Sequence, residues 1–388
     1  MNPASQPSTE PPLQAVGWSP AQDAVRIIDQ TELPEREIVR DLRSLDDVAR
    51  AIARLEVRGA PAIGIAAAMG LVVSLDPHAG ESRAAFLELA RAHAARLRET
   101  RPTAVNLAWA LERVLQAAER GEGSPRELLQ RMRDEATAIL EEDRAMCRRI
   151  GELGAPLVPD DACVLTHCNA GALATGGTGT ALAPVYRAVE LGRRVRVVVG
   201  ETRPLLQGSR LTAWELTRAG IPVTVIPDSA AAALMRRGDV SFCLVGGDRV
   251  AANGDVANKI GTYALALAAR HHAIPFYVAV PSSTLDPATP LGASIAIEER
   301  PREEIARLQG MSAPLLPDGA AVWNPAFDVT PAELVTAIIT DRAVYRPPYR
   351  FESRASRSTR DVATSANGGA ASPGARSATS TTLSAEPR

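Results

Sequence analysis

The sequence predicts an α/β protein in which a mainly helical N-terminal domain precedes a doubly wound parallel sheet. Apolar residues recur at helical spacing between residues 44 and 153, whereas from residue 160 short apolar runs alternate with helical segments. A strand, a crossover and a further strand, repeated four times, is typical of a parallel sheet covered by helices. One or two short strands are expected within residues 24–40, before the helices begin.

The N-terminal domain is predicted over residues 16–153. Ser44 and Asp47 resemble a capping box at the start of its first helix. Amphipathic helices are then expected over residues 83–99, 104–119 and 125–150. The longest apolar stretch, Ala62–Val73, has 12 residues, too few to span a bilayer. Because the first residues also lack a signal-peptide pattern, a cytoplasmic protein is expected.

The second domain is predicted over residues 154–352 and is Rossmann-like in its alternation. Five strands are expected at residues 162–166, 195–199, 223–226, 240–245 and 276–280. Helices are expected over residues 178–191 and 209–219, up to residue 236, and from Asn258-Lys259 onward. Ligands of such folds bind beyond the carboxyl ends of the strands. The residues that follow each strand are therefore the candidates for binding and catalysis.

The amino-acid composition limits the classes of binding partner that are expected. Residues 1–15 and 353–388 are poor in large apolar side chains and are predicted to be disordered. The net charge of −2 provides no basic field for nucleic acid or an anionic membrane. The four cysteines contain no CxxC pair, and the five histidines have no metal-ligand spacing. Of the 43 basic residues, a single one is lysine, Lys259.

Cys168 and a glycine-rich turn, Gly176–Thr180, follow the first strand of the second domain. A cysteine ahead of a helix can have an activated thiol, although cysteine is also a small buried hydrophobe. The glycines could present backbone amides to a phosphate or could simply permit a tight turn. The residues alone leave both alternatives open.

Asp248 follows two glycines at the end of the fourth of these strands. A carboxylate in this position can be a general acid or base, but the residues favour a turn cap or a pair with Arg249. Arg58 and Arg101 each lie beside a proline-containing turn. Either could clamp a phosphate, whereas a solvated side chain is the more common fate of an arginine.

These segments together resemble the methylthioribose-1-phosphate isomerase family. Its superfamily also contains ribose-1,5-bisphosphate isomerase and the regulatory alpha, beta and delta subunits of the initiation-factor-2B exchange complex. The resemblance covers about residues 16–348 and is carried by Val57–Gly64, Arg101–Leu107, Thr166–Thr175, Glu201–Pro204 with Gln207-Gly208, Asp248-Arg249 with Asn253–Asp255, Asn258–Thr262 and Asn324–Pro331. Gly247 stands where this family usually has alanine, and the missing methyl is expected to loosen the backbone beside Asp248.

The resemblance implies an aldose–ketose isomerase of methionine salvage that converts 5-methylthioribose 1-phosphate into 5-methylthioribulose 1-phosphate. It implies no metal and no cofactor, a homodimer, and Cys168 and Asp248 as the catalytic pair. It also implies that the helical domain closes over the site. The substrate-binding residues that it implies are Arg58, Gly59, Ala60, Arg101, Gln207, Asn258 and Lys259.

Two other functions remain open. A ribose-1,5-bisphosphate isomerase would keep the same cysteine and aspartate, but its pocket for the C5 substituent would be cationic rather than apolar. A regulatory subunit would be a binding module, and fold analogy alone does not separate it from an enzyme. Such a subunit is expected to lack the catalytic pair, yet Cys168, Asp248 and Lys259 are all present. The residues do not choose between a hydride shift and proton transfer.

Overall fold

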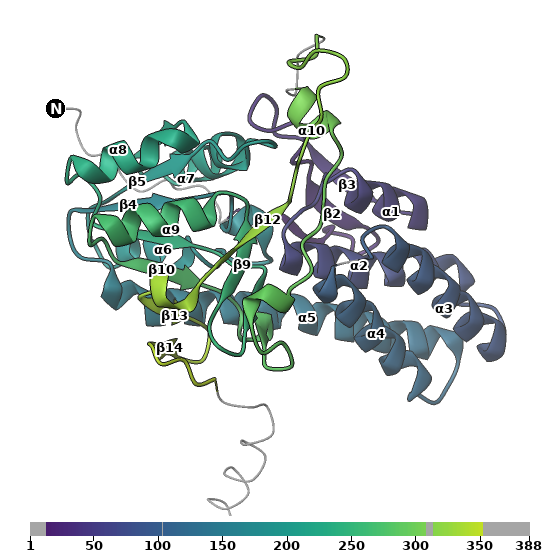
Figure 1. The fold of residues 1–388 in the computed structure, drawn as a ribbon. Helices are drawn as coiled ribbons and strands as arrows, with labels where there is room; N and C mark the ends of the chain where they lie inside the picture. Colours follow the sequence, from purple (N-terminus) through teal and green to yellow (C-terminus); the bar gives the residue numbers. More distant parts are fainter. Residues whose placement is uncertain (1–12, 103, 308–312, 352–388) are drawn as a thin grey trace, which may run out of the picture. The chain divides into compact units, whose positions relative to one another are not determined.

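A computed structural model describes residues 13–102, 104–307 and 313–351 and confirms the predicted α/β class (Figure 1). Residues 1–12 and 353–388, predicted to be disordered, lie outside the described residues. Ala15, at the end of the first of these predicted segments, is 1% exposed. Its carbonyl accepts a hydrogen bond from the Ile28 amide at 3.1 Å, so the chain is tied to the fold before residue 16.

A three-stranded antiparallel sheet and five helices form the N-terminal part. The strands are β1 (Val16–Trp18), β2 (Val25–Ile28) and β3 (Val39–Leu42). The helices are α1 (Leu45–Ala53), α2 (Ala60–Leu75), α3 (Arg83–Glu99), α4 (Val105–Glu119) and α5 (Pro125–Gly154). Ser44 caps α1 by accepting a hydrogen bond from the Asp47 amide, as the capping pattern predicted.

Helix α2 is the central helix of this part. It packs against α1, α3, α4 and α5, and its residues from Ala62 to Leu75 are buried. The 19 residues from Ala60 to His78 are long and apolar enough, by composition, to cross a membrane. However, 78% of the most apolar window is buried inside the protein. Helix α2 is therefore apolar on every side because other helices surround it.

The C-terminal part is built on a seven-stranded sheet in the order β14-β13-β10-β7-β4-β5-β6. The strands are β4 (Ala162–Thr166), β5 (Val195–Gly200), β6 (Val223–Ile226), β7 (Phe242–Val245), β10 (Phe276–Ala279), β13 (Ala337–Ile339) and β14 (Val344–Tyr345). All neighbours are parallel except β13 and β14. The chain runs outward from β4 to β6 and then returns to β7 on the other side of β4. The strand order therefore reverses between β4 and β7, where ligands bind in such sheets.

Helices α6 to α9 connect these strands, and a small second sheet follows β7 (Figure 1). The helices are α6 (Ala183–Glu190), α7 (Ala213–Arg218), α8 (Ala231–Arg236) and α9 (Thr262–His271), with the short α10 (Glu303–Ala306) further on. The small sheet has the order β11-β8-β9-β12, formed by β11 (Leu285–Asp286), β8 (Arg249–Ala251), β9 (Val256–Lys259) and β12 (Phe327–Thr330).

The prediction that Asn258-Lys259 opens a helix is wrong. These residues end β9, and α9 begins at Thr262, after Gly261 with a φ of 102°. Strand β9 pairs with β12, so that Lys259 lies opposite Phe327. The partner strand lies far along the chain, and such non-local pairing decides strand formation more than local propensity does.

Candidate active site

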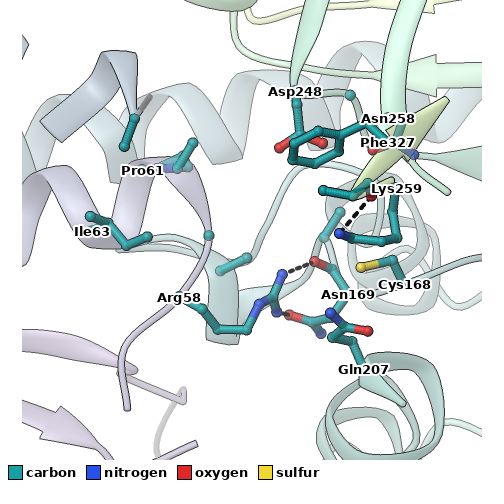
Figure 2. Close-up of a pocket in the computed structure, with 18 of the residues that line it drawn as sticks. Arg58, Pro61, Ile63, Cys168, Asn169, Gln207, Asp248, Asn258, Lys259 and Phe327 are labelled. Atoms are coloured by element: carbon teal, nitrogen blue, oxygen red, sulfur yellow. Dashed lines mark hydrogen bonds between the residues drawn. The ribbon is translucent and has the colours of Figure 1, made fainter. Parts of the chain in front are cut away.

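All nine residues implied by the resemblance line a single cavity of about 590 Å³. These residues are Arg58, Gly59, Ala60, Arg101, Cys168, Gln207, Asp248, Asn258 and Lys259. Figure 2 shows Arg58 on one side of this cavity and Asp248, Lys259 and Cys168 on the other. Cys168 and Asp248 follow β4 and β7, which are adjacent parallel strands. The cavity therefore lies at the position where the strand order reverses.

Cys168 is the cavity's thiol. All four cysteines lie in the described ranges and are buried, and of these only Cys168 lines the cavity. Burial raises the pKa of Cys147 to about 12 and also raises the pKa values of Cys163 and Cys243. Those three thiols therefore fit the interpretation of small buried hydrophobes. Cys168 differs from them because a ligand in the cavity can reach it.

Asp248 directs its carboxylate into the cavity instead of pairing with its neighbour. Arg249 contacts Asp286, with 3.5 Å between Nη1 and Oδ2. Within the described part of the chain, the Asp248 carboxylate has no hydrogen-bond or ion-pair partner. The Asp248 amide donates to the Ala257 carbonyl at 2.8 Å, which fixes the backbone. The carboxylate is thus left for a ligand, in contrast to the turn cap or arginine pair that the residues alone favoured.

Loss of bulk solvent inside the cavity raises the pKa of Asp248. Asp248 is exposed toward the cavity, yet the protein atoms around its carboxylate displace part of the bulk solvent, and this desolvation is the main cause of the raised pKa. The positive charges of Lys259, Arg58 and Arg101 oppose this shift. A raised pKa increases the fraction of Asp248 that carries a proton near neutral pH, which a general acid requires.

Neighbouring side chains fill the space beside Gly247 that the missing methyl would otherwise occupy, while the looser backbone beside Asp248 stays a prediction. A Cβ at this position would lie 2.9 Å from Cγ1 of Val280 and 3.1 Å from Cγ1 of Val256. These branched side chains are stiff and already occupy the space that an alanine methyl would take. In this chain the strand end is therefore packed as tightly with glycine as it could be with alanine.

Arg58 connects the N-terminal part to the turn after β4. Its Nη1 donates to Asn169 Oδ1 at 2.7 Å and its Nη2 to the Asn169 carbonyl at 2.9 Å (Figure 2). Gly59, with a φ of 93°, allows this approach, because a Cβ there would lie 2.4 Å from the Ala174 carbonyl oxygen. Arg58 is consequently held in place and is not a freely solvated side chain. Its remaining N–H groups can face an anion in the cavity.

Glu215, on α7, organises the same turn and was missed by the sequence analysis. Its carboxylate accepts hydrogen bonds from Asn169 Nδ2 at 3.2 Å, the Leu173 amide at 3.1 Å and Tyr186 Oη at 3.1 Å. The side chain is buried, and burial raises its pKa. Nothing in the local sequence distinguishes Glu215 from a solvated helix residue, so only the fold reveals its role in holding Asn169.

Lys259 enters the cavity from the end of β9. Its Nζ donates to the Ala326 carbonyl at 2.8 Å and lies 4.6 Å from the centre of the Phe327 ring. The neighbouring Asn258 is buried and donates to Thr262 Oγ1 at 3.0 Å. Phe327 begins strand β12, which was not predicted from the sequence. The contact between the Lys259 ammonium and the Phe327 ring was therefore not anticipated either.

Arg101 and Gln207 complete the predicted set. Nη2 of Arg101 lies 4.0 Å from Oε2 of Glu298, and burial lowers the pKa of Arg101 while Glu298 opposes the shift. Gln207 is 6% exposed, and its Oε1 has no hydrogen-bond partner among the described residues. A buried acceptor of this kind can accept a hydrogen bond from a hydroxyl group of a polar ligand. The cavity thus offers cations for a phosphate and an amide for a sugar hydroxyl.

The glycine-rich turn is a tight turn whose amides are already used. The amides of Gly177 and Gly179 donate to Thr175 Oγ1, and the Gly176 amide donates to Asp143 Oδ2 at 2.6 Å. The following helix, predicted from residue 178, begins only at Ala183. These bonds settle the open alternative against a phosphate cradle at Gly176–Gly179.

Asp143 gives a stability prediction. Burial raises its pKa to about 6, so folding favours its protonated form. Protonated Asp143 therefore contributes fully to the stability of the folded state below the pKa that this carboxyl has in the unfolded chain. The contribution is lost as the pH rises through the folded-state pKa of about 6. Urea titration of the wild type and of Asp143→Asn gives the free energy of unfolding of each protein at each pH. Between pH 4 and pH 7, the wild-type value should fall by about 2–3 kcal/mol more than the value of the variant. The exposed Asp134 lies on the same helix, and Asp134→Asn is the control. Equal differences at every pH would contradict the prediction.

The comparison with known families matches residues 56–347 to the initiation factor 2 subunit family. The chain belongs to this family. Within it, methylthioribose-1-phosphate isomerase of Gemmatimonas aurantiaca is 54% identical over 352 residues, which is 89% of this chain and 99% of that protein. The methylthioribose-1-phosphate isomerase of Anaeromyxobacter sp. is 55% identical and covers 87% of this chain and 95% of that protein.

Two solved structures that are similar to this chain carry names of different kinds. 5-Methylthioribose 1-phosphate isomerase from Pyrococcus horikoshii is 41% identical with a TM-score of 0.81, over 90% of this chain and 97% of that chain. The translation initiation factor eIF-2B subunit delta from A. fulgidus is 45% identical with a TM-score of 0.80, over 87% and 97% respectively. Because both kinds share the fold, the cavity residues must distinguish an enzyme from a binding subunit.

Proposed function

We propose that this chain is a methylthioribose-1-phosphate isomerase, which acts in methionine salvage. The single observation that carries the proposal is the placement of Cys168 and Asp248 at the ends of adjacent parallel strands, facing one cavity. Arg58, Arg101 and Lys259 line the same cavity and supply the positive charge that a phosphate needs. Relatives of this name that are 54%, 55% and 52% identical support the assignment.

The chemistry explains the need for an acid. The substrate carries phosphate on C1 and has no free aldehyde, so its ring must open before the isomerisation. In the proposed mechanism, protonated Asp248 donates to the ring oxygen as the bond to C1 breaks, and it recovers a proton from the C2 hydroxyl as the ketone forms. Hydrogen leaves C2 and a hydrogen arrives at C1, so the reaction is redox-neutral overall.

Cys168 acts at C2 in this proposal. Its thiolate can abstract the C2 proton, or the thiol can stabilise the transition state of a direct hydride shift from C2 to C1. Substrate deuterated at C2 tests for proton transfer with solvent exchange. Complete recovery of the label at C1 indicates a direct shift or a base shielded from solvent, whereas loss of label to water indicates proton transfer with exchange.

The cavity favours a neutral C5 substituent over a second phosphate. Arg249 contacts Asp286, and Arg300 is held by Glu298 and Glu304. Arg210 donates to backbone carbonyls, among them that of Gln30 at 2.8 Å, and Arg54 is exposed. Apolar side chains also line the cavity, namely Leu55, Ile63, Leu205, Ile295, Ile297 and Phe327. A second phosphate placed against these apolar side chains would have its charge poorly compensated.

The decisive experiment measures turnover of 5-methylthioribose 1-phosphate and ribose 1,5-bisphosphate by the purified full-length chain. We expect kcat/KM to be at least ~100-fold higher for the methylthio sugar, because a charged substituent is poorly accommodated by apolar side chains. Cys168→Ser, assayed in parallel, shows whether the turnover belongs to this cavity. A preference for the bisphosphate would assign the rival activity, and turnover of neither sugar would favour a regulatory subunit.

The proposal also includes a domain organisation, an oligomeric state and a cellular location. We propose two domains, residues 16–153 and 154–352, with the cavity between them and the N-terminal domain contributing Arg58 and Arg101. Movement of these domains would open and close the site around the phosphate. We further propose a homodimer and a cytoplasmic location, which size-exclusion chromatography and cell fractionation would test.

A further inference from the structure

We infer that Thr202 and Thr212 are positioning residues that hold the Cys168 thiol toward the substrate. The inference rests on the proposed function, in which Cys168 takes part in the reaction. Thr202 belongs to the Glu201–Pro204 segment that carries the resemblance, but no role was assigned to it or to Thr212 from the sequence, and neither is among the residues that line the cavity. Their hydroxyl groups instead contact the backbone of Cys168 from two different elements, the loop after β5 and the π-helical turn before α7.

The backbone of Cys168 is unusual. Its φ of 61° lies in the left-handed region, which is uncommon and unfavourable for a residue with a Cβ. Such a conformation persists only where the surrounding structure holds it in place. The conformation matters because the φ and ψ of Cys168 decide where its side chain points at the end of β4.

Two short hydrogen bonds hold this conformation from both sides. The Cys168 amide donates to Thr202 Oγ1 at 2.8 Å, and the Cys168 carbonyl accepts from Thr212 Oγ1 at 2.6 Å. Thr202 is 0% exposed and Thr212 is 1% exposed, so bulk water does not compete for these bonds. The two hydroxyls therefore fix the peptide groups that precede and follow the reactive side chain.

Thr202 is itself held in an unfavourable conformation. Its φ is 67°, which is rare for a β-branched residue. The Thr202 amide donates to Asp228 Oδ1 at 2.8 Å, and its hydroxyl donates to the Gly200 carbonyl at 3.0 Å. That hydroxyl has its proton engaged, so it can only accept from Cys168. The loop after β5 thus builds a fixed acceptor aimed at the Cys168 amide.

Thr212 contacts Cys168 from a π-helical turn. Residues Gly208–Thr212 form a π-helical turn, a feature often found at functional sites, and α7 follows it. Besides donating to the Cys168 carbonyl, Thr212 Oγ1 accepts from Asn169 Nδ2 at 3.2 Å. Because Asn169 holds Arg58, this single hydroxyl links the thiol to a cavity cation.

The test uses valine and serine variants of both threonines in the full-length protein. Valine keeps the branched shape but removes the hydroxyl, whereas serine keeps the hydroxyl. We expect Thr202→Val and Thr212→Val each to lower kcat by about tenfold to hundredfold with KM changed less than about twofold, because displacement of a reacting group by about 1 Å costs up to 10²-fold. The serine variants should recover most of that loss. Thr217→Val, at an exposed position on α7, is the matched control.

The second readout is independent of turnover. Iodoacetamide alkylation of Cys168, assigned by mass spectrometry, should slow in both valine variants and return in the serine variants. Unchanged kcat and alkylation rates in both valine variants would overturn the inference. The inference would also be overturned if the serine variants did not recover the kcat lost in the valine variants and if kcat simply followed the melting temperature across all variants. Full activity of Cys168→Ser would instead reject the proposed role of Cys168 in the reaction, and the alkylation rates would still decide whether the threonines position the thiol.

Discussion

Asp248→Asn is expected to lower kcat by about 10²–10⁴-fold while KM changes by less than about threefold. Asparagine keeps the size of the side chain but can neither donate a proton to the ring oxygen nor recover one. The wild-type carboxyl has a raised pKa because protein surrounds it, so its acid form persists to higher pH than in an ordinary aspartate. The wild-type kcat should therefore fall as the pH rises through this pKa, and steady-state kinetics across pH should find no such limb in the variant.

Asp239 provides the control for this variant. Asp239 precedes β7, whereas Asp248 follows it, so the two carboxylates lie beyond opposite ends of this strand. The Asp239 side chain contacts Arg237. Asp239→Asn should therefore retain wild-type kcat and the same pH profile. If Asp248→Asn kept more than about a tenth of the wild-type kcat, the carboxyl would not be the general acid.

Lys259→Arg should lower kcat/KM by about tenfold to hundredfold, although the charge is kept. The ammonium of Lys259 donates to the Ala326 carbonyl and lies over the Phe327 ring. A guanidinium is longer, planar and more weakly hydrated, so it cannot occupy the same position without displacing these groups. Kinetics with the methylthio sugar and binding of inorganic phosphate as a competitive inhibitor would show whether the loss lies in phosphate recognition.

The reverse exchange at a surface position is the control for the lysine prediction. Arg196 is exposed on β5, so Arg196→Lys should leave kcat/KM within about twofold of the wild type. If Lys259→Arg behaved in the same way, the presence of the single lysine in this cavity would be a coincidence of composition.

Local patterns predicted the elements that depend on local interactions. Helix α3 and strand β4 have the predicted bounds, because amphipathic spacing and short buried runs report directly on burial. Strand β6 also has the predicted bounds, although its residues are half-buried or exposed, because its β-branched residues favour a strand. The end of β9 was mistaken for a helix start, since its pairing with β12 is non-local. Strands β13 and β14 were missed for the same reason, as their place in the sheet depends on contacts with β10 and with each other.

The candidate site divides in the same manner. Motifs led to Arg58, Cys168 and Asp248, and the fold brings these residues to one cavity, although their roles remain predictions. Glu215 could not be found, because an acidic residue on a helix carries no sign that it will be buried beneath a turn. The glycine-rich turn was ambiguous in sequence, since only hydrogen-bond partners reveal whether its amides are available to a ligand.

The single lysine makes the cavity addressable by amine chemistry. Reductive methylation with ¹³C-formaldehyde would label Lys259 and the terminal amino group alone, because the chain contains no other lysine. The Lys259 signal in NMR spectra would then report on ligand arrival without any engineered probe. The same property has a practical cost: amine coupling to a biosensor surface has only Lys259 and the terminal amino group to react with, and attachment by Lys259 would obstruct the cavity.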